Sequence, residues 1–388
     1  MEKKMFDKEK IERLTGKLVS IRTPNPPGNE YRLANYLESE LKSRGISYER
    51  IETRKKRPSI IAKVGIGKPE ILVTSHMDTV SPIPKKEWKT NPYEMVKVGD
   101  EIYGLGVADD KGQIASSLLV AHALSKGNFN GTYTLAFTSD EEDTKNTIVD
   151  LVESKILRPD FAIIADNASS LEHITIGEMG EIFGRFNVHG RTSHQSMPIK
   201  GKAAEALMDI LTELKNYNFG VMSHPAFVGE ESKPFVNVTY IGAGDEEYGG
   251  VIPEKAIATV SIEFLPGENP QKVIEDIRKI NKKISAKYDN QIRTRFDYLK
   301  PVDIPCVVNP SNQHIANLQN VSKKILNRDV KLKTESGTTS LKPVIHAGID
   351  GVAYGPGSID VIHRPNEHIS LSELHDFSSI LYNFVKNQ

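Results

Sequence analysis

Hydrophobic residues recur at two spacings along the first 165 residues, and the two spacings alternate. Apolar positions three or four residues apart predict helices near residues 11–18, 33–41 and 111–124. Short runs of apolar and β-branched residues predict strands at residues 46–51, 59–64, 71–75, 132–138 and 161–165. Strands that alternate with helices are typical of an α/β domain with a mostly parallel central sheet, flanked by helices on both faces.

A different order of elements begins near Gly180. The pattern predicts a strand at 182–188, a helix at 203–214, strands at 235–241 and 256–264, a helix at 270–284 and a strand at 291–298. This order is typical of a ferredoxin-like α+β sandwich. After Pro301 the chain is predicted to return to helix and loop elements.

The two patterns predict one domain inserted into another. We expect a larger domain in two parts, residues 1–178 and 300–388. The insertion, residues 179–299, is expected to form a ferredoxin-like α+β domain.

Composition excludes several classes of function. The 50 basic and 51 acidic residues leave a net charge of −1, so no global field attracts nucleic acid or an anionic membrane. The basic cluster Arg54–Arg57 is interpreted as a solvated turn between two strands. No run reaches the roughly 18 apolar residues of a membrane span, and the charged first ten residues lack a signal-peptide core. We therefore expect a cytoplasmic protein without a nucleic-acid or membrane partner.

The residues that bear chemistry follow predicted strands, where an open α/β sheet gathers its functional groups. The candidates are His76, Asp78, Asp109, Asp110, Glu141, Glu142, Asp166 and His363. The single cysteine, Cys306, excludes a cysteine-based metal site, so any metal must bind oxygen and imidazole ligands. Histidines with carboxylates suit zinc, cobalt or manganese. Two such ions bridged by a carboxylate can contact both an attacking water and a substrate oxygen.

Each residue alone has a simpler explanation. Asp109 and Asp110 before a predicted helix are most simply an N-cap. The neighbouring Glu141 and Glu142 are usually a solvated turn. Taken together and in order along the chain, the candidates favour a metal site over these separate explanations.

These motifs resemble those of the dinuclear zinc hydrolase family that includes acetylornithine deacetylase, succinyl-diaminopimelate desuccinylase and carboxypeptidase G. The likeness covers nearly the whole chain. It extends to Pro26-Pro27-Gly28-Asn29-Glu30, Gly190-Arg191-Thr192-Ser193-His194 with Pro198, and Asn366-Glu367.

The resemblance implies two divalent metal ions, zinc foremost, with cobalt or manganese as alternatives. His76, Asp109 and Asp166 would hold one ion. Asp109, Glu142 and His363 would hold the other, so that Asp109 bridges the pair.

The resemblance also implies that the larger domain is catalytic and that the insertion is a lid or dimerisation domain. It implies the roles of the catalytic residues as well. Asp78 would orient the first metal-binding histidine, and Glu141 would be the general base that activates a metal-bridging water. His194 would stabilise the oxyanion; in dimeric relatives this histidine comes from the partner subunit. The insert of about 120 residues is similar to the dimer-forming version, so a homodimer is expected. Asn237 and Lys342 would contact the substrate.

Some positions depart from the family pattern. Asp166 stands where deacylases and carboxypeptidases usually have Glu, whereas di- and tripeptidases usually have Asp. Further departures from common family residues are Leu105, Glu263, Ser340 and Lys342. Lys342 would neutralise a substrate carboxylate as a point charge.

We therefore predict an enzyme that hydrolyses the amide bond of a small N-acyl amino acid. A dipeptidase or carboxypeptidase with the same dinuclear site is the alternative within the enzyme class. A catalytically silent binding or scaffold protein is the alternative from another class.

Overall fold

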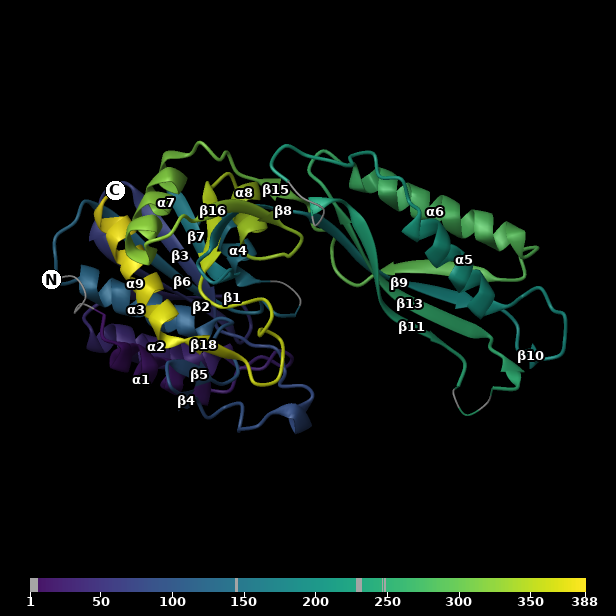
Figure 1. Ribbon diagram of the computed structural model, residues 1–388, viewed down its shortest axis with the longest axis horizontal. Coiled ribbons are helices and arrows are strands. Elements are labelled where there is room, and N and C mark those ends of the chain that lie inside the picture. The colour runs from purple at the N-terminus through teal and green to yellow at the C-terminus, as the bar shows by residue number, and fades with distance from the viewer. Residues whose placement is uncertain (1–5, 144–145, 228–231, 246, 248) are drawn as a thin grey trace. The chain divides into compact units, whose positions relative to one another are not determined.

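The computed structural model describes residues 6–143, 146–227, 232–245, 247 and 249–388. The chain divides into two compact units, each with its own elements in Figure 1. The first unit contains the residues up to Ile176 together with Val308–Lys333 and Thr338–Gln388. The second contains Gly177–Val307 and the short segment Thr334–Gly337, which the sequence pattern does not predict. The functional roles of the predicted domains, catalytic and lid, stay a prediction.

The first unit is built on a large mixed sheet. The strand order is β1-β2-β6-β3-β7-β17-β8-β15, and β16 also pairs with β8. The four strands β6, β3, β7 and β17 are parallel neighbours, whereas the pairs at the edges are antiparallel. The bounds are β1 Ser47–Arg54, β2 Arg57–Ile66, β3 Glu70–His76, β6 Gly131–Thr138, β7 Phe161–Ala168, β8 His173–Glu178, β15 Cys306–Val307, β16 Lys331–Glu335 and β17 Gly351–Gly355.

Helices pack around this sheet because most of them present one apolar face. Their bounds are α1 Lys8–Ser20, α2 Glu30–Ser43, α3 Lys111–Leu124, α4 Thr147–Glu153, α7 Gln313–Leu326, α8 Leu341–His346 and α9 Leu371–Lys386. α3 is different: it is apolar or small on nearly every side and is buried along almost its whole length. It packs against α1, α9 and the strands β3 and β6. α3 is therefore a central helix of the first unit, and it coincides with the predicted helix 111–124.

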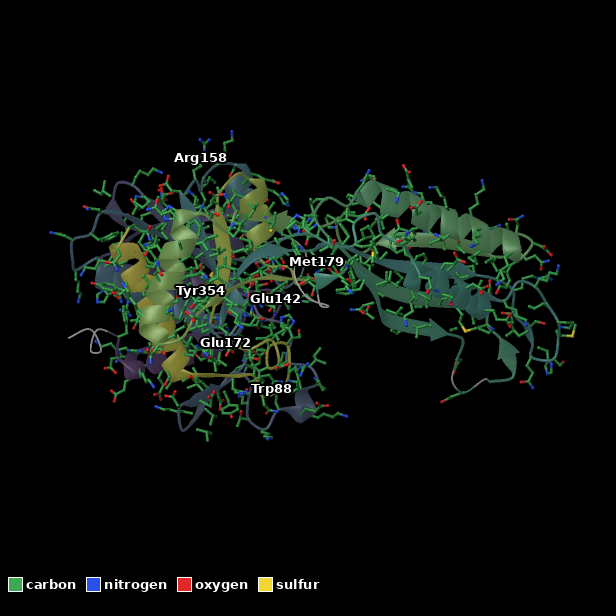
Figure 2. The ribbon with its side chains drawn as sticks, turned by 45° about the horizontal axis from the view of Figure 1, so that its top comes forward. Trp88, Glu142, Arg158, Glu172, Met179 and Tyr354 are labelled. Atoms are coloured by element: carbon green, nitrogen blue, oxygen red, sulfur yellow. The ribbon has the colours of Figure 1, made fainter. Side chains whose placement is uncertain are left out.

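The central strand β17 is not among the predicted strands, and neither is its neighbour β8. The chain after Pro301 was expected to form helices and loops, but β17 lies fully buried between β7 and β8. Its apolar run, Val352-Ala353-Tyr354, is only three residues long and is flanked by Gly351 and Gly355, so the local pattern is too short to identify a strand. Figure 2 labels Tyr354, whose ring is fully buried.

The second unit has the predicted split order of elements. Its sheet runs β11-β13-β9-β14, all antiparallel, and two helices pack on it. The strand β9 alternates between buried and more exposed residues, as a strand with one covered face must. The bounds are β9 Gly180–His189, α5 Ala203–Lys215, β11 Phe235–Ala243, β13 Lys255–Phe264, α6 Pro270–Lys287 and β14 Arg293–Tyr298.

Smaller elements complete the described chain. A three-stranded sheet joins β4 Val96–Val98, β5 Glu101–Tyr103 and β18 His368–Ser370, and a two-stranded sheet joins β10 Ser193–His194 and β12 Val251–Ile252. The 3-10 helix η2 spans Lys85–Glu87. Among the helices of the described residues, none has the length and hydrophobicity that crossing a bilayer requires.

Candidate metal centre

The candidate ligands lie where neighbouring parallel strands end. His76 is the last residue of β3, and Glu141 and Glu142 follow the end of β6. Asp166 lies near the end of β7, and His363 lies in the loop that follows β17. Because β6, β3, β7 and β17 are adjacent and parallel, their carboxyl ends meet at one edge of the sheet.

Asp109 lies at the middle of the cluster. Its Oδ1 is 2.8 Å from His76 Nε2, and its Oδ2 is 3.0 Å from His363 Nε2. Glu142 Oε2 lies 3.1 Å from the same His363 nitrogen. One carboxylate thus contacts two imidazoles with its two oxygens, and a second carboxylate shares one of those imidazoles.

Two overlapping groups of side chains have the spacing of a metal site. Ligand atoms of His76, Asp109 and Glu142 lie within 4.8 Å of one another, as do those of His76, Glu141 and Asp166. Asp166 Oδ2 is 4.0 Å from His76 Nε2. The structure therefore brings these five predicted residues together, and it places both adjacent glutamates at the cluster.

Asp78 supports the cluster through backbone amides. Its carboxylate accepts hydrogen bonds from the backbone N–H groups of Glu141 and Glu142, at 3.2 and 3.0 Å. The Nδ1 atom of His76 is 3.1 Å from the Asp78 main-chain carbonyl and 3.7 Å from its carboxylate. Asp78 thus contacts the predicted ligand His76 and also holds the loop that carries both glutamates.

A buried polar network behind Asp78 was missed by the sequence reasoning. Asn25 Nδ2 donates to Asp78 Oδ2 at 2.8 Å and to Asp140 Oδ1 at 2.9 Å. Arg57 donates to Asn25 Oδ1 at 3.0 Å and pairs with the buried Glu30. The signal was present, because Asn25 directly precedes the Pro26-Pro27-Gly28-Asn29-Glu30 motif.

The basic cluster Arg54–Arg57 contributes to this network. Arg54 pairs with Asp140 at 2.7 Å and with Asp150 at 3.1 Å. The interpretation of the cluster as a solvated turn is therefore wrong for its two arginines. Arg54 ends β1 and Arg57 begins β2, and both side chains reach Asp140 in the loop that follows β6.

Asp110 occupies the N-cap position of α3, but its side chain does not cap the helix. Its side chain makes no capping hydrogen bond; instead its Oδ2 accepts from the backbone N–H of His76 at 2.9 Å. The N-cap explanation therefore holds for the position of this residue and is wrong for its side chain. Asp110 ties the end of β3 to the start of α3.

Glu367 is a second residue that the sequence reasoning did not assign. Its carboxylate accepts from the backbone N–H groups of Gly106, Ala108 and Asp109, at 2.9, 2.8 and 3.1 Å. Burial, followed by the charge of Asp109, raises the pKa of Glu367 to about 8. Glu367 is buried against the Asp109 loop and holds its backbone in place.

Contacts with carboxylates raise the pKa values of both histidines. Burial alone would lower the pKa of His76, but its contacts with Asp109 and Asp78 outweigh burial and raise it well above the ordinary value. Hydrogen bonds to Asp109 and Glu142 raise the pKa of His363 to about 11. Burial raises the pKa of Asp109, but its two histidine partners outweigh burial and lower it.

The pKa values of the two adjacent glutamates shift upwards, in the direction opposite to that of Asp109. Burial raises the pKa of Glu141 well above its ordinary value, and the charge of Asp166 adds to the effect. Burial and the charge of Asp109 likewise raise the pKa of Glu142. Close-packed carboxylates of this kind disfavour one another's ionised form, and a divalent cation removes that penalty. The donor set of imidazole and carboxylate, without thiolate, fits a zinc-type ion.

Three predicted residues lie on other elements. Lys342 is on α8 in the first unit, is buried, and donates from Nζ to Thr338 Oγ1 at 2.8 Å. His194 is on β10 in the second unit, is exposed, and contacts Ser196 Oγ through Nδ1 at 2.8 Å. Asn237 is exposed on β11, opposite Ser261 of β13. Their roles stay predictions.

Comparison with known proteins agrees with this geometry. The sequence matches the family described as peptidase family M20/M25/M40 over residues 72–387. It is 28% identical to an uncharacterized metallohydrolase of Methanocaldococcus jannaschii, covering 97% of this chain and 99% of that protein. It is 25% identical to succinyl-diaminopimelate desuccinylase of Pelagibacter ubique, covering 95% and 96% of the two chains.

The fold has relatives among solved structures. The M20 family metallo-carboxypeptidase Sso-CP2 of Sulfolobus solfataricus superimposes with a TM-score of 0.80 at 20% identity, covering 98% of this chain and 99% of that one. The match to the family spans most of the sequence and includes the residues of the cluster. The chain therefore belongs to peptidase family M20/M25/M40 and is a metallohydrolase of that family.

Proposed function

We propose that this metallohydrolase cleaves the amide bond of a small N-acyl amino acid and uses two divalent metal ions, zinc foremost. The main support is Asp109, whose two oxygens face the Nε2 atoms of two different histidines, His76 and His363. That is the arrangement expected of a carboxylate that bridges two ions. Desuccinylase activity of the Pelagibacter ubique relative, which is similar over nearly its whole length, supports the class of substrate.

The proposed ligands follow the same geometry. His76, Asp109 and Asp166 hold one ion, and Asp109, Glu142 and His363 hold the other. When bound, the ions supply a Lewis acid and increase the acidity of water beside them. Cobalt or manganese suits the same donors.

Two side chains that are not proposed as ligands transfer the proton and position the groups around it. Glu141 accepts a proton from the attacking water and passes it to the leaving amine, because a carboxylate that is not a ligand is needed for that transfer. Asp78 supports this role, since it holds the Glu141 backbone N–H. Asp78 also orients His76, through the contacts that it makes with the imidazole Nδ1.

Three further residues are proposed to contact the substrate. Lys342 neutralises the carboxylate of the amino-acid product half, and its burial favours a fixed point charge. His194 stabilises the oxyanion, and its exposure leaves the ring accessible. Asn237, exposed on β11, contacts the substrate. We propose a homodimer in which His194 serves the partner's site.

One observation favours a second candidate. Asp166 occupies a ligand position where di- and tripeptidases of the family usually have Asp. A dipeptidase or carboxypeptidase with the same cluster is therefore the alternative.

A hydrolysis panel on zinc- or cobalt-loaded protein tests the proposal. Amine release is compared for N-acetyl and N-succinyl amino acids, unblocked dipeptides and carboxypeptidase substrates. Preference for an N-acyl amino acid supports the proposal, and preference for dipeptides replaces it with the alternative. If the protein neither binds metal nor hydrolyses any of these substrates, it is a catalytically silent binding or scaffold protein instead.

A further inference from the structure

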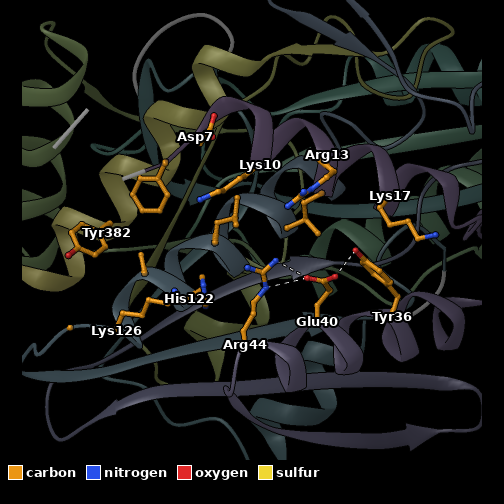
Figure 3. Close-up of a pocket in the computed structure, with 15 residues that line it drawn as sticks. Asp7, Lys10, Arg13, Lys17, Tyr36, Glu40, Arg44, His122, Lys126 and Tyr382 are labelled. Atoms are coloured by element: carbon orange, nitrogen blue, oxygen red, sulfur yellow. Dashed lines mark hydrogen bonds and ion pairs between the residues drawn. The ribbon is translucent and has the colours of Figure 1, made fainter. Parts of the chain in front are cut away.

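The first unit has a cavity of about 770 Å³ that contains none of the proposed metal ligands. Figure 3 shows its lining, which comes from α1, α2, the end of α3 and Tyr382 of α9. Small-molecule sites commonly have volumes of about 300–1,000 Å³. The cavity is thus large enough for a ligand much bigger than a single inorganic ion.

Cationic side chains dominate the rim of this cavity. Lys10, Arg13 and Lys17 come from successive turns of α1, whereas Arg44 and Lys126 come from just beyond the ends of α2 and α3. The two acids of the lining are Asp7 and Glu40. These seven residues leave a net charge of about +3 on the lining.

The acids do not neutralise the cations of α1. Glu40 already pairs with Arg44 at 2.7 Å and accepts from the Tyr36 hydroxyl at 2.9 Å. Asp7 accepts from the backbone N–H of Glu9 as the N-cap of α1.

Two other charged residues of α1 form ion pairs: Lys8 contacts Asp100, and Glu12 contacts Lys97. By contrast, within the described residues, Lys10, Arg13 and Lys17 form no ion pair. The positive charge therefore collects on the face that lines the cavity.

The floor of the cavity is apolar, except for one buried nitrogen atom without a hydrogen-bond partner among the described residues. Phe6, Leu14 and Leu119 are buried there, and the Tyr382 ring meets Phe6 edge-on with centroids 5.8 Å apart. His122 Nδ1 is buried, and the described residues offer it no hydrogen-bond partner. Burial lowers the pKa of His122, and the nearby cations Lys126, Arg44 and Lys10 lower it further.

We propose that this cavity binds a small organic phosphate, with its phosphate groups at the cationic rim and an aromatic or apolar body on the floor. Arginine suits phosphate because its planar guanidinium donates two parallel hydrogen bonds. A nucleoside triphosphate has this combination of polyanion and planar body. The site is separate from the metal cluster, and it does not depend on the hydrolase substrate.

The test uses the metal-loaded full chain with saturating Mg²⁺. A fluorescent ATP analogue is titrated by anisotropy, and ATP, inorganic triphosphate and adenosine compete in separate arms. Arg13→Glu removes a rim cation. Lys42→Glu makes the same charge change on α2 at an exposed position that does not line the cavity. Ala123 also lines the cavity, and Ala123→Phe fills part of it without changing charge. Thermal unfolding checks that each variant folds.

We expect ATP to bind with a Kd below 1 mM, and Arg13→Glu to weaken it at least tenfold while Lys42→Glu changes it less than twofold. Ala123→Phe should weaken ATP more than inorganic triphosphate. Equal loss in Arg13→Glu and Lys42→Glu, or no ATP binding below 1 mM, would overturn the proposal. Binding to phosphatidylglycerol vesicles without any ATP binding would also overturn it, because the ligand would then be a lipid headgroup.

Discussion

Asp109 contacts His76 with one carboxylate oxygen and His363 with the other. An unpaired carboxylate buried to this degree would be costly. The two imidazoles, and the backbone amide of Asp109 that Glu367 holds, fix its position. Pre-positioned ligands of this kind need little rearrangement when a cation binds.

Glu141→Ala tests the proposed general base. Turnover should fall by about 10²–10⁴-fold, because proton transfer by a positioned carboxylate contributes roughly that factor. Metal content should remain, since Glu141 is proposed as a base and not a ligand. The measurements are kcat on the preferred substrate and metal per chain by mass spectrometry.

Glu153→Ala, an exposed glutamate on α4, is the matched control and should keep full turnover. Loss of metal from Glu141→Ala would instead make Glu141 a ligand, as its proximity to His76 and Asp166 allows.

Asn25 is expected to act as a positioning residue. Its amide donates to both Asp78 and Asp140 in a buried site, so Asn25→Ala leaves two buried carboxylates without that donor. We expect a loss of about 1–3 kcal/mol in the free energy of unfolding. We also expect a fall in kcat with a smaller change in KM, because the Glu141 loop depends on Asp78.

Asn35→Ala provides the comparison. Asn35 lies on the exposed face of α2 and accepts from Arg50 at 2.7 Å. Denaturant unfolding and steady-state kinetics are measured for both variants. If both substitutions change stability and kcat equally, Asn25 has no specific positioning role.

At the scale of elements, the first turn of α3 packs tightly against the preceding loop and against α9. A Cβ on Gly112 would lie 2.4 Å from the Val107 carbonyl oxygen and 2.9 Å from Leu374 Cδ2. Only glycine therefore lets α3 begin directly after Asp109 and Asp110. The position of these acids depends on this close packing.

Gly112→Ala should displace the start of α3 and weaken metal binding. We expect a stability loss of about 1–3 kcal/mol, the usual cost of overpacking. Gly127→Ala, just beyond the same helix, meets nothing within 4 Å and should change stability by less than about 0.5 kcal/mol. Thermal unfolding of both variants, measured at increasing metal concentrations, gives their stability and their metal affinity. Unchanged metal affinity in Gly112→Ala would show that the close packing at Gly112 does not position the ligands.

The start of α9 should respond to acid. Burial raises the pKa of Asp100, but hydrogen bonds from Lys8 and Ser372 outweigh it and lower this pKa to about 2. A lowered pKa stabilises the folded chain above the ordinary value of 3.8, and this contribution disappears as the pH falls towards 2. Because the side chain is 43% exposed, we expect at most about 1 kcal/mol.

Asp100→Asn should therefore be less stable than the parent at pH 7, and the difference should shrink below pH 3.8. Glu49→Gln, an exposed acid on β1, should show no comparable change. Denaturant midpoints across the pH range provide the measurement. A stability difference that stays constant down to pH 2 would argue against the ion pair as its source.

At the scale of the whole molecule, the proposed dimer with His194 acting across subunits gives a specific expectation. Light scattering at micromolar concentration should report twice the 43.1 kDa chain mass. Glu141→Ala and His194→Ala should each be nearly inactive alone. Mixed and re-equilibrated, they should regain activity, because one site of each mixed dimer has both an intact Glu141 and an intact partner His194.

Homodimers of either single variant provide the baseline for that mixing experiment. A monomer by light scattering would overturn the dimer. A dimer whose mixture stays inactive would place His194 in the site of its own chain.

Much of the fold was predictable because local patterns agree with the tertiary structure. The helix at 111–124 has apolar residues at helical spacing, and the split order of the second unit follows its pattern of strands and helices; both are present. The short strand β17 was not predictable, since three apolar residues between glycines suit a strand, a turn or a buried loop equally well. Its place in the centre of the sheet comes from pairing with β7, a contact between residues far apart in sequence.

The sequence by itself determined the donors: histidines and carboxylates placed after strands, with no thiolate, and motifs that indicate the family. Tertiary structure alone decided which of these atoms meet, because distances between Asp109, His76 and His363 depend on how parallel strands align. It also decided that Asn25, Arg57 and Glu367 support the cluster. Their hydrogen bonds join segments that are far apart along the chain, and no local pattern encodes such contacts.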